Sequence, residues 1–385
     1  MTTTSTHPFP AEQGRGTTGR TGPRIAILGT GMIGAVHRRA ALLAGAELVG
    51  AMASTPDRSA EAAAQWGTEP LSRPEDLQRL RPDVVHVCSP NGLHAEHVEA
   101  ALEAGAHVIC EKPLSVDSAQ AIRLARLASE HGKVATVPFV YRFHPLVREI
   151  RARAAQGEFG PWQILHGSYL QDWLLSPAST SWRVGASTGG PSRAFADIGS
   201  HWCDLMEFVT GERISSVLAE MTTTVPERPS PGRSDEPPVP VDTEDAAAVV
   251  FRTDSGVLGQ VTVSQVSAGR KNRLWFEFDG AHKSAVFDQE NPETVWLGSE
   301  ERAEVVPRDP ARGSAEQRRL SVLPAGHPQG YAQCFENFIA DTYAVVGGEE
   351  RQGLPTFADG VRSACIVDAV IESARTRTWT EVSPV

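Results

Sequence analysis

The first third of the chain alternates between short apolar runs and longer runs whose apolar residues recur with helical spacing. The short runs predict buried strands at residues 24–28, 48–53, 83–88, 107–110 and 134–137. The longer runs predict helices at residues 35–43, 57–66, 94–103 and 117–131. Regular alternation of strand and helix is typical of a right-handed, doubly wound parallel sheet. We therefore expect an α/β domain over residues 24–141.

The pattern changes in the rest of the chain, where longer stretches alternate apolar and polar positions. These stretches predict strands at residues 163–170, 216–224, 246–252, 257–266, 273–278 and 284–287, and helices are expected at 198–210, 330–346 and 357–376. Short turns such as residues 253–256 favour antiparallel pairing. Residues 142–385 are therefore expected to form an α+β domain with one large, mostly antiparallel open sheet. An apolar open face would favour a homodimer or homotetramer.

The composition of the chain disfavours some classes of binding partner. The 36 basic and 47 acidic residues give a net charge of -11, which disfavours binding to nucleic acid and to anionic membranes. No apolar run reaches the roughly 20 residues that span a bilayer. The five cysteines are scattered along the chain, which predicts buried thiols in a reducing compartment. A cytoplasmic protein is therefore expected. We expect residues 1–23 to form a disordered tail and the proline-rich residues 226–242 to form a loop.

A glycine-rich turn follows the first predicted strand. Gly29 suits a sharp turn, Gly31 lets the backbone approach a pyrophosphate, and Gly34 packs the helix on the strand, with Met32 and Ile33 between them. Backbone N–H groups at the helix start would then hold the phosphates. A plain strand-turn-helix is the alternative, but the complete context favours a dinucleotide-binding domain of the Rossmann type.

The end of the second strand bears on the choice of dinucleotide. An acidic residue there usually binds the ribose hydroxyls of NAD, whereas an arginine accommodates the phosphate of NADP. This chain instead carries Ser54, Thr55 and Arg58 as candidate ligands. Both dinucleotides remain open on the residues alone.

Ligands of doubly wound sheets bind just beyond the carboxyl ends of the strands. The candidate cofactor ligands there are Ser89, Pro90, Asn91, His94, Glu111 and Lys112, and the candidate substrate ligands are Tyr141 and Arg142. Lys112 ends a buried strand and precedes a proline, so we expect it beside the nicotinamide, where its amine can act on a substrate oxygen. The alternative is a lysine that lies along the surface and pairs with Glu111 or Glu103.

A second group of polar residues lies in the predicted helix near residue 198. Helical spacing places Asp197, His201 and Asp204 on one face. An imidazole with an ordinary pKa of about 6.5 can take a hydroxyl proton at neutral pH, and Asp197 would orient its ring. The alternatives are a structural histidine on a solvated helix and a metal site. No metal is expected, because no further histidine or cysteine clusters with the three.

Four of these motifs carry a resemblance: the glycine loop, the Ser-Pro-Asn loop to His94, Glu111-Lys112-Pro113 and Asp197-Ile198-Gly199-Ser200-His201. Together they resemble the Gfo/Idh/MocA oxidoreductase family. The resemblance implies an NAD(P)-dependent dehydrogenase that acts on a hydroxyl-bearing carbon of a cyclic sugar or polyol. By the same resemblance, Lys112, Asp197 and His201 are the expected catalytic residues.

A narrower resemblance, to the levoglucosan dehydrogenase branch of that family, rests on residues 167–173, 181–183 and 225–228. It implies NAD as the cofactor and a pyranoside-like substrate. The candidate sugar ligands are Gln171, Asp172, Trp182, Arg183 and His327, although ordinary sheet and loop packing would also account for them. Two other functions stay open: a glycosidase or dehydratase that oxidises the sugar only transiently, and a sensor that binds dinucleotide and sugar without catalysis.

Overall fold

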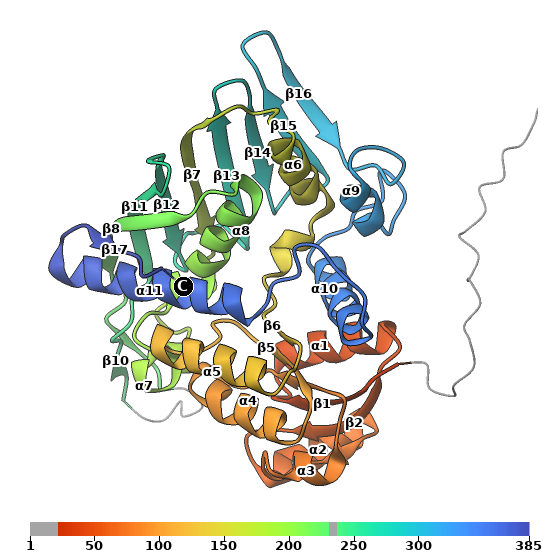
Figure 1. The fold of residues 1–385 in the computed structure, drawn as a ribbon. Helices are drawn as coiled ribbons and strands as arrows, with labels where there is room; N and C mark the ends of the chain where they lie inside the picture. The colour runs from red at the N-terminus through yellow and green to blue at the C-terminus, as the bar shows by residue number, and fades with distance from the viewer. Residues whose placement is uncertain (1–21, 231–236, 385) are drawn as a thin grey trace, which may run out of the picture.

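The computed structural model describes residues 22–230 and 237–384, which build two large sheets and a two-stranded ribbon, with helices packed around the large sheets (Figure 1). The first sheet is six-stranded and parallel, with the order β3-β2-β1-β4-β5-β6. Its strands are β1 (Arg24–Leu28), β2 (Glu47–Met52), β3 (Glu69–Pro70), β4 (Val84–Val87), β5 (His107–Cys110) and β6 (Ala135–Thr136). Its helices are α1 (Met32–Leu43), α2 (Pro56–Trp66), α3 (Asp76–Leu80), η1 (Asn91–Leu93), α4 (His94–Glu103) and α5 (Ser118–Glu130).

This arrangement confirms the predicted doubly wound α/β sheet. Strand β4 is buried at all four positions and β1 at four of five, as expected for strands covered by helices on both faces. The strand order changes direction between β1 and β4, and the carboxyl ends of these two strands open towards the second sheet. A ligand crevice is expected at that switch point.

The second sheet has nine strands in the order β16-β15-β14-β13-β7-β12-β11-β8-β17. They are β7 (Trp162–Leu170), β8 (Ile214–Thr222), β11 (Ala246–Thr253), β12 (Leu258–Ser264), β13 (Arg273–Gly280), β14 (Ser284–Asp288), β15 (Thr294–Gly298), β16 (Ala303–Pro307) and β17 (Thr380–Glu381). All neighbouring strands are antiparallel except β7 and β12, which run parallel. The predicted mostly antiparallel open sheet is therefore confirmed.

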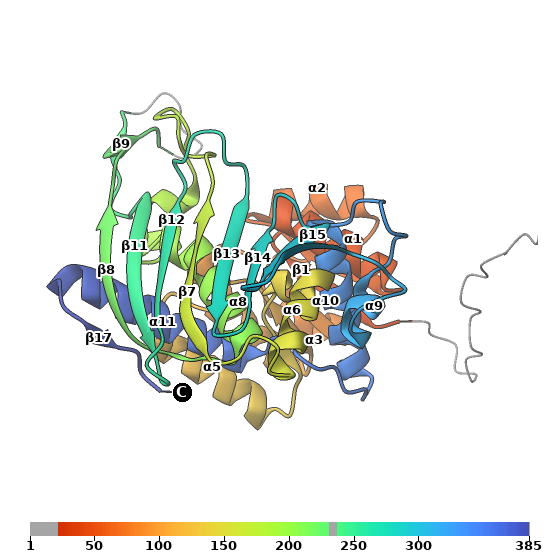
Figure 2. The same cartoon turned by 90° about the horizontal axis from the view of Figure 1, so that it is seen from above.

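Helices pack against one face of this sheet (Figures 1 and 2). The remaining helices are η2 (Val140–Phe143), α6 (Pro145–Ala155), η3 (Trp182–Val184), α7 (Ala186–Gly189), η4 (Phe195–Gly199), α8 (Ser200–Thr210), α9 (Ala315–Leu320), α10 (Tyr331–Val346) and α11 (Phe357–Thr376). On β11, buried and exposed positions alternate strictly from Ala247 to Thr253. The buried side chain of Phe251 meets Trp202 of α8, and the exposed positions lie on an outer face that no helix of the described residues covers (Figure 2).

Several short elements were not predicted, because segments of two to eleven residues with mixed polarity carry little periodicity. Residues 226–242 were expected to form only a loop, yet β9 (Glu227–Arg228) and β10 (Val239–Pro240) pair in a small antiparallel ribbon within that segment. Burial explains the ribbon, since Arg228 is completely enclosed. Most of the expected tail, residues 1–21, lies outside the described residues. The proposed domain boundary after residue 141 falls within η2 and stays a prediction.

Two further expectations concern cysteines and membranes. All five cysteines are free and buried, as predicted for thiols of the interior. Among the residues that the structure describes, no helix combines the length and apolar character needed to cross a bilayer.

Candidate active site

A large cleft of about 1240 Å³ lies between the two sheets. One wall is formed by the loops after β1, β2, β4 and β5, and the other by β7, η3, η4 and the start of α8. The cleft therefore brings together the predicted glycine loop, Lys112, Asp197 and His201, which are far apart in the sequence. Side chains from both sheets can thus act on one bound molecule.

The glycine loop has the geometry expected of a phosphate-binding turn. Gly29 has a φ of 111°, and a side chain there would collide with the carbonyl of Cys88 at 2.3 Å. A Cβ at Gly34 would lie 2.0 Å from the carbonyl oxygen of Gly29, whereas one at Gly31 would meet nothing within 4 Å. Helix α1 begins at Met32 without a side-chain cap, so its first N–H groups are available to an anion. The residues present fit a dinucleotide pyrophosphate.

The adenosine end of the cleft is lined by Ser54 and Arg58, and the Arg58 guanidinium donates to the Ser54 hydroxyl at 3.2 Å. Arg73 also lines this end and was not predicted, because nothing in its loop marks it in the sequence. Thr55 does not line the cleft. Its hydroxyl instead accepts the backbone N–H of Arg58 and caps α2.

The cleft is bordered by the predicted cofactor ligands Ser89, Pro90, Asn91 and His94. Two of these side chains, those of Asn91 and His94, form hydrogen bonds with backbone carbonyls of the protein. Asn91 donates to the carbonyl of Gly189 at 2.9 Å, and the two ring nitrogens of His94 lie 2.9 Å from Ser89 O and 2.8 Å from Pro113 O. His94 is buried, and burial lowers its pKa. These two residues therefore fix the loops around Lys112.

Lys112 pairs with Asp197 rather than with Glu111 or Glu103. Its ammonium nitrogen lies 2.6 Å from Asp197 Oδ1 and 2.9 Å from the Asp197 carbonyl oxygen, and Gln265 donates to Asp197 Oδ2 at 2.8 Å. Burial alone would raise the pKa of Asp197, but Lys112, and then Arg183, hold it well below the ordinary value. Asp197 is thus a carboxylate that holds the lysine amine in the cleft.

His201 lies beside this pair, edge-on to the ring of Tyr141 with the ring centroids 4.9 Å apart. Its Nδ1 has no hydrogen-bond partner among the described residues. Burial lowers the pKa of His201 well below its ordinary value, the charge of Lys112 lowers it further, and Asp197 only partly opposes this. The ring is therefore neutral at neutral pH and able to accept a proton.

The expectation of one shared helix face for Asp197, His201 and Asp204 is wrong. Residues 195–199 form a π-helical turn, whose wider spacing breaks the four-residue step. The carboxylate of Asp197 binds Lys112 and Gln265, not the ring of His201. Asp204 lines a separate pocket of about 490 Å³, so the three do not form the metal site that was weighed as an alternative.

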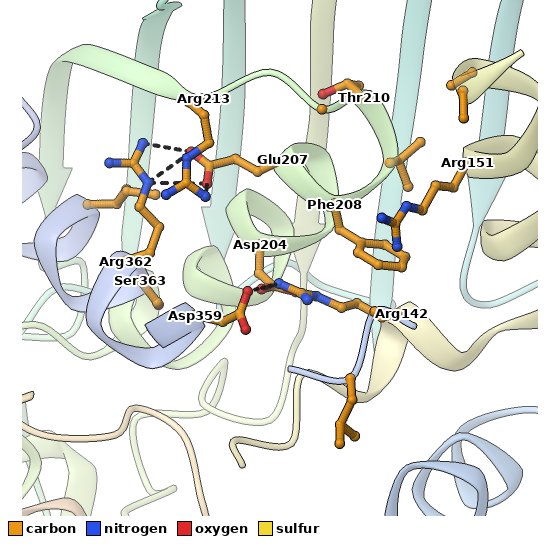
Figure 3. Close-up of a pocket in the computed structure, with 17 residues that line it drawn as sticks. Arg142, Arg151, Asp204, Glu207, Phe208, Thr210, Arg213, Asp359, Arg362 and Ser363 are labelled. Carbon is orange, nitrogen blue, oxygen red and sulfur yellow. Dashed lines mark hydrogen bonds and ion pairs between the residues drawn. The ribbon is translucent and has the colours of Figure 1, made fainter. Parts of the chain in front are cut away.

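Arg142, predicted to bind substrate, also faces that separate pocket (Figure 3). Its guanidinium donates to Asp204 Oδ2 at 2.8 Å and to Asp359 Oδ1 at 2.7 Å. Because Arg142 is buried and its donors are used by two carboxylates, it joins η2, α8 and α11. The prediction that Arg142 reaches the substrate therefore does not fit the structure.

Two more predicted sugar ligands lie outside the cleft lining. The carboxylate of Asp172 accepts from Lys271 at 2.7 Å and from the backbone of Gly269 at 3.1 Å. The side chain of His327 is exposed, and its carbonyl accepts from Arg308 at 2.8 Å. In contrast, the cleft is lined by the predicted substrate ligands Tyr141, Gln171, Trp182 and Arg183. The predicted cofactor ligand Glu111 also lines it.

The cleft also contains polar groups that sequence reasoning missed. Asn272 accepts from Tyr169 at 2.7 Å and from Gln171 at 2.8 Å, and it donates to Tyr141 at 3.1 Å. Tyr169 lies within the strand predicted at residues 163–170, and Asn272 lies between the strands predicted at 257–266 and 273–278, so neither was singled out. Only the pairing of β7 with β13, which sets Leu170 opposite Arg273, brings them together.

Comparison with known proteins gives consistent results. The model of the "Oxidoreductase family, NAD-binding Rossmann fold" matches residues 23–139, and that of the "GFO/IDH/MocA C-terminal domain" matches residues 147–286. Levoglucosan dehydrogenase of Pseudarthrobacter phenanthrenivorans is 31% identical over 358 residues, which cover 86% of this chain and 88% of that protein.

Two solved structures extend the likeness to three dimensions. Levoglucosan dehydrogenase in complex with NADH and levoglucosan has a TM-score of 0.85 and 29% identity, with 94% of this chain and 99% of that chain covered. An inositol dehydrogenase homolog from Azotobacter vinelandii, complexed with NADH and myo-inositol, has a TM-score of 0.82 and 26% identity, with 93% and 97% covered. The likeness thus extends over both sheets and the cleft between them.

Proposed function

The chain belongs to the GFO/IDH/MocA oxidoreductase family, and from this premise we propose that it is an NAD-dependent dehydrogenase of a cyclic sugar or polyol. The observation that carries the proposal is the meeting of Lys112, Asp197 and His201 in the cleft that also contains the glycine loop. When bound, NAD supplies the acceptor for the hydride that leaves the substrate carbon. The relatives solved with NADH support this choice of cofactor.

The roles of the three residues follow from their geometry and charge. Neutral His201 takes the proton of the substrate hydroxyl, since its ring lines the cleft and is uncharged at neutral pH. Lys112 donates a hydrogen bond to the same oxygen and stabilises its developing negative charge. Asp197 holds the lysine amine through the 2.6 Å ion pair, and the hydrogen bonds of its carboxylate go to Lys112 and Gln265.

The sugar end of the cleft supports a pyranoside-like substrate, such as levoglucosan or a related glycoside, or an inositol. Tyr141, Tyr169, Gln171 and Asn272 form a connected set of hydrogen bonds along one wall. Trp182 offers a flat apolar surface, and the guanidinium of Arg183 lies over it at 4.2 Å from the ring centroid. Such a combination of hydroxyl-binding groups and an aromatic plane suits a polyhydroxylated ring.

A homodimer or homotetramer is the proposed assembly, through the outer face of the nine-stranded sheet. Large apolar side chains with more than a third of their surface exposed lie on five strands of that sheet: Ile164, Val250, Leu258, Trp296 and Val305. A second copy of the chain would cover them. The mass in solution, measured by light scattering, tests this.

The function is tested by following NADH absorbance while NAD and NADP are each combined with levoglucosan, inositols, glucose and methyl glucosides. We expect NADH to accumulate with at least one anhydrosugar, glycoside or inositol. Product formation without net NADH would instead identify the protein as a glycosidase or dehydratase that oxidises the sugar transiently. Thermal stabilisation by dinucleotide and sugar, but no product of either kind, would assign a sensor.

A further inference from the structure

Behind the cleft, four polar side chains from four different parts of the fold form an unbroken line of hydrogen bonds. Glu111 Oε1, just after β5, lies 2.9 Å from Nε2 of His37 on α1. Nδ1 of His37 lies 3.0 Å from Nδ1 of His86 on β4. Nε2 of His86 lies 2.8 Å from the hydroxyl of Tyr343 on α10. We call these four residues the histidine chain.

The histidine chain crosses an otherwise apolar interior. His37 and His86 are both 0% exposed, and they pack among apolar residues such as Ile27, Val84 and Phe335. Polar groups in such surroundings are costly unless each finds a partner. Within the histidine chain every ring nitrogen has one, so the line is fully satisfied.

The charges of the residues decide where the hydrogens lie. Burial opposes ionisation of Glu111, but the hydrogen bond and charge of His37, with Lys112, hold its pKa below the ordinary value. Burial, followed by the nearby His37, keeps the pKa of His86 well below its ordinary value, and burial raises the pKa of Tyr343. Glu111 is therefore a carboxylate, His86 a neutral imidazole and Tyr343 a phenol.

Two arrangements place a single hydrogen in each link. In the first, Tyr343 donates its hydroxyl hydrogen to His86 Nε2, His86 donates from Nδ1 to His37 Nδ1, and His37 donates from Nε2 to the Glu111 carboxylate. In the second, Glu111 carries a proton and donates it to His37 Nε2, His37 donates from Nδ1 to His86 Nδ1, and His86 donates from Nε2 to the Tyr343 oxygen. The line is continuous in both arrangements, as proton transfer requires.

The two ends of the histidine chain lie in different environments. Glu111 lines the cleft together with Lys112 and His201, and its Oε2 accepts the backbone N–H of Lys112 at 3.1 Å. Tyr343 is partly buried and lies on α10, which packs beside α1 (Figure 1). The line therefore runs from the cleft to a residue with part of its surface exposed.

We propose that the histidine chain is a proton relay that connects the cleft with solvent. As a solvent proton binds the Tyr343 oxygen, the phenol hydrogen moves to His86 Nε2, the His86 Nδ1 hydrogen to His37 Nδ1, and the His37 Nε2 hydrogen to Glu111. One O–H bond breaks and one forms at Tyr343, each imidazole gains one proton and loses one, and no electrons are exchanged. Release of a proton from the cleft starts from the second arrangement: the Glu111 hydrogen moves to His37 Nε2, the His37 Nδ1 hydrogen to His86 Nδ1, the His86 Nε2 hydrogen to the Tyr343 oxygen, and the Tyr343 hydroxyl hydrogen to solvent.

The relay rests on the proposed dehydrogenase function, because oxidation of a secondary alcohol frees one proton for each hydride transferred. That proton is taken by His201, which lines the same cleft as Glu111. A bound dinucleotide and sugar fill the cleft and restrict the access of water to the reacting oxygen. The histidine chain then provides a second route to solvent.

The first test needs no substrate. In protein labelled with ¹⁵N-histidine, the hydrogen shared by His37 and His86 is followed by NMR as it exchanges with solvent. Tyr343→Phe removes only the outer hydroxyl and should slow this exchange about tenfold or more. Thr342→Val is the matched control, since Thr342 has a buried hydroxyl on the same helix that bonds to Thr136 and to Phe338 O, outside the histidine chain. Exchange that is equally fast in all three proteins would overturn the relay.

The second test follows turnover by stopped flow, with NADH absorbance and a pH indicator recorded together in weak buffer. In Tyr343→Phe and in His86→Gln, whose amide keeps hydrogen bonds but cannot pass a proton, NADH should form at the normal rate while proton release lags about tenfold. Proton release in step with NADH in both variants would overturn the relay, as would slowed NADH formation without a lag. If the unaltered protein forms no NADH, the proposed function fails, while the exchange measurement still decides the relay.

Discussion

The ammonium nitrogen of Lys112 lies 2.6 Å from Oδ1 of Asp197, although the two residues are 85 positions apart and belong to the two different halves of the cleft. The amine also donates to the carbonyl oxygen of Asp197 at 2.9 Å. Two acceptors from one residue fix the position of the amine. Asp197 is therefore a positioning residue for Lys112, a role different from the one that helical spacing suggested.

Replacing Lys112 with alanine should lower kcat by about 10²-fold to 10⁴-fold, because a group that stabilises the reacting oxygen is lost. NADH binding should change little, since the glycine loop is untouched. Steady-state kinetics and a fluorescence titration with NADH measure the two effects separately.

The matched control for this prediction is Lys271→Ala. Lys271 also pairs with an aspartate, Asp172, at 2.7 Å, but it is exposed and outside the cleft lining. Its loss should leave kcat near that of the unaltered protein. Equal kcat values for the Lys112 and Lys271 variants would contradict the role given to Lys112.

Acid should inactivate the enzyme only well below neutrality, because His201 is the proposed base. Burial first, and then the positive charge of Lys112, lower the pKa of His201 well below its ordinary value of 6.5. The active, neutral ring is therefore present at neutral pH and is lost only as the pH falls through that lowered pKa. A pH profile of kcat/KM for oxidation should stay level through pH 6.5 and fall on the acid side.

His201→Gln keeps a polar side chain that cannot take a proton in this pH range. We expect kcat to drop about 10²-fold or more and the acid fall of the pH profile to disappear. A variant that retains the same acid fall would show that another group takes the proton.

The choice between NAD and NADP should respond to Ser54, which lies beside Arg58 at the adenosine end of the cleft. A carboxylate at this position would bind ribose hydroxyls and repel a 2′-phosphate. Ser54→Asp should therefore raise the preference for NADH over NADPH by about tenfold, which corresponds to about 1.4 kcal/mol. Dissociation constants for both dinucleotides test this, and Thr55→Asp serves as the control, because Thr55 does not line the cleft. An unchanged ratio in Ser54→Asp would contradict the assignment of this end of the cleft.

The glycine loop, the alternating strands and the Lys112 segment were predictable, because each depends on local spacing and on turns that only certain residues form. The contacts of Asp197 were not, because a single π-helical turn changes the spacing before His201. Those of Asp204 were not either, because its partner Arg142 lies 62 positions away in the sequence. Arg142 was misassigned for a related reason: its position after a strand suggested the cleft, but two carboxylates from distant helices bind it. Asn272 carries no sequence signal, since only the pairing of β13 with β7 brings it to the cleft.

A buried cluster around Asp245 gives a prediction about stability. Arg193, Arg228 and Asp245 all have side chains that are 0% exposed, and both guanidinium groups pair with the same carboxylate oxygen. The other oxygen accepts the backbone N–H groups of Thr224 and Val225 at 2.7 and 2.9 Å. Asp245→Ala would leave two buried positive charges without their shared carboxylate, which costs about 3–5 kcal/mol of unfolding free energy.

The same change should weaken substrate binding, because Arg228 also donates to the carbonyls of Leu174, Ser176 and Ser179, just before the segment that carries Trp182. We expect a higher KM for the sugar and little change in NADH affinity. Urea unfolding and steady-state kinetics measure both effects. The control is Glu220→Ala, which removes an exposed ion pair with Arg377 and should cost less than about 1 kcal/mol. If the two variants unfold at the same urea concentration, the cluster does not stabilise the fold as proposed.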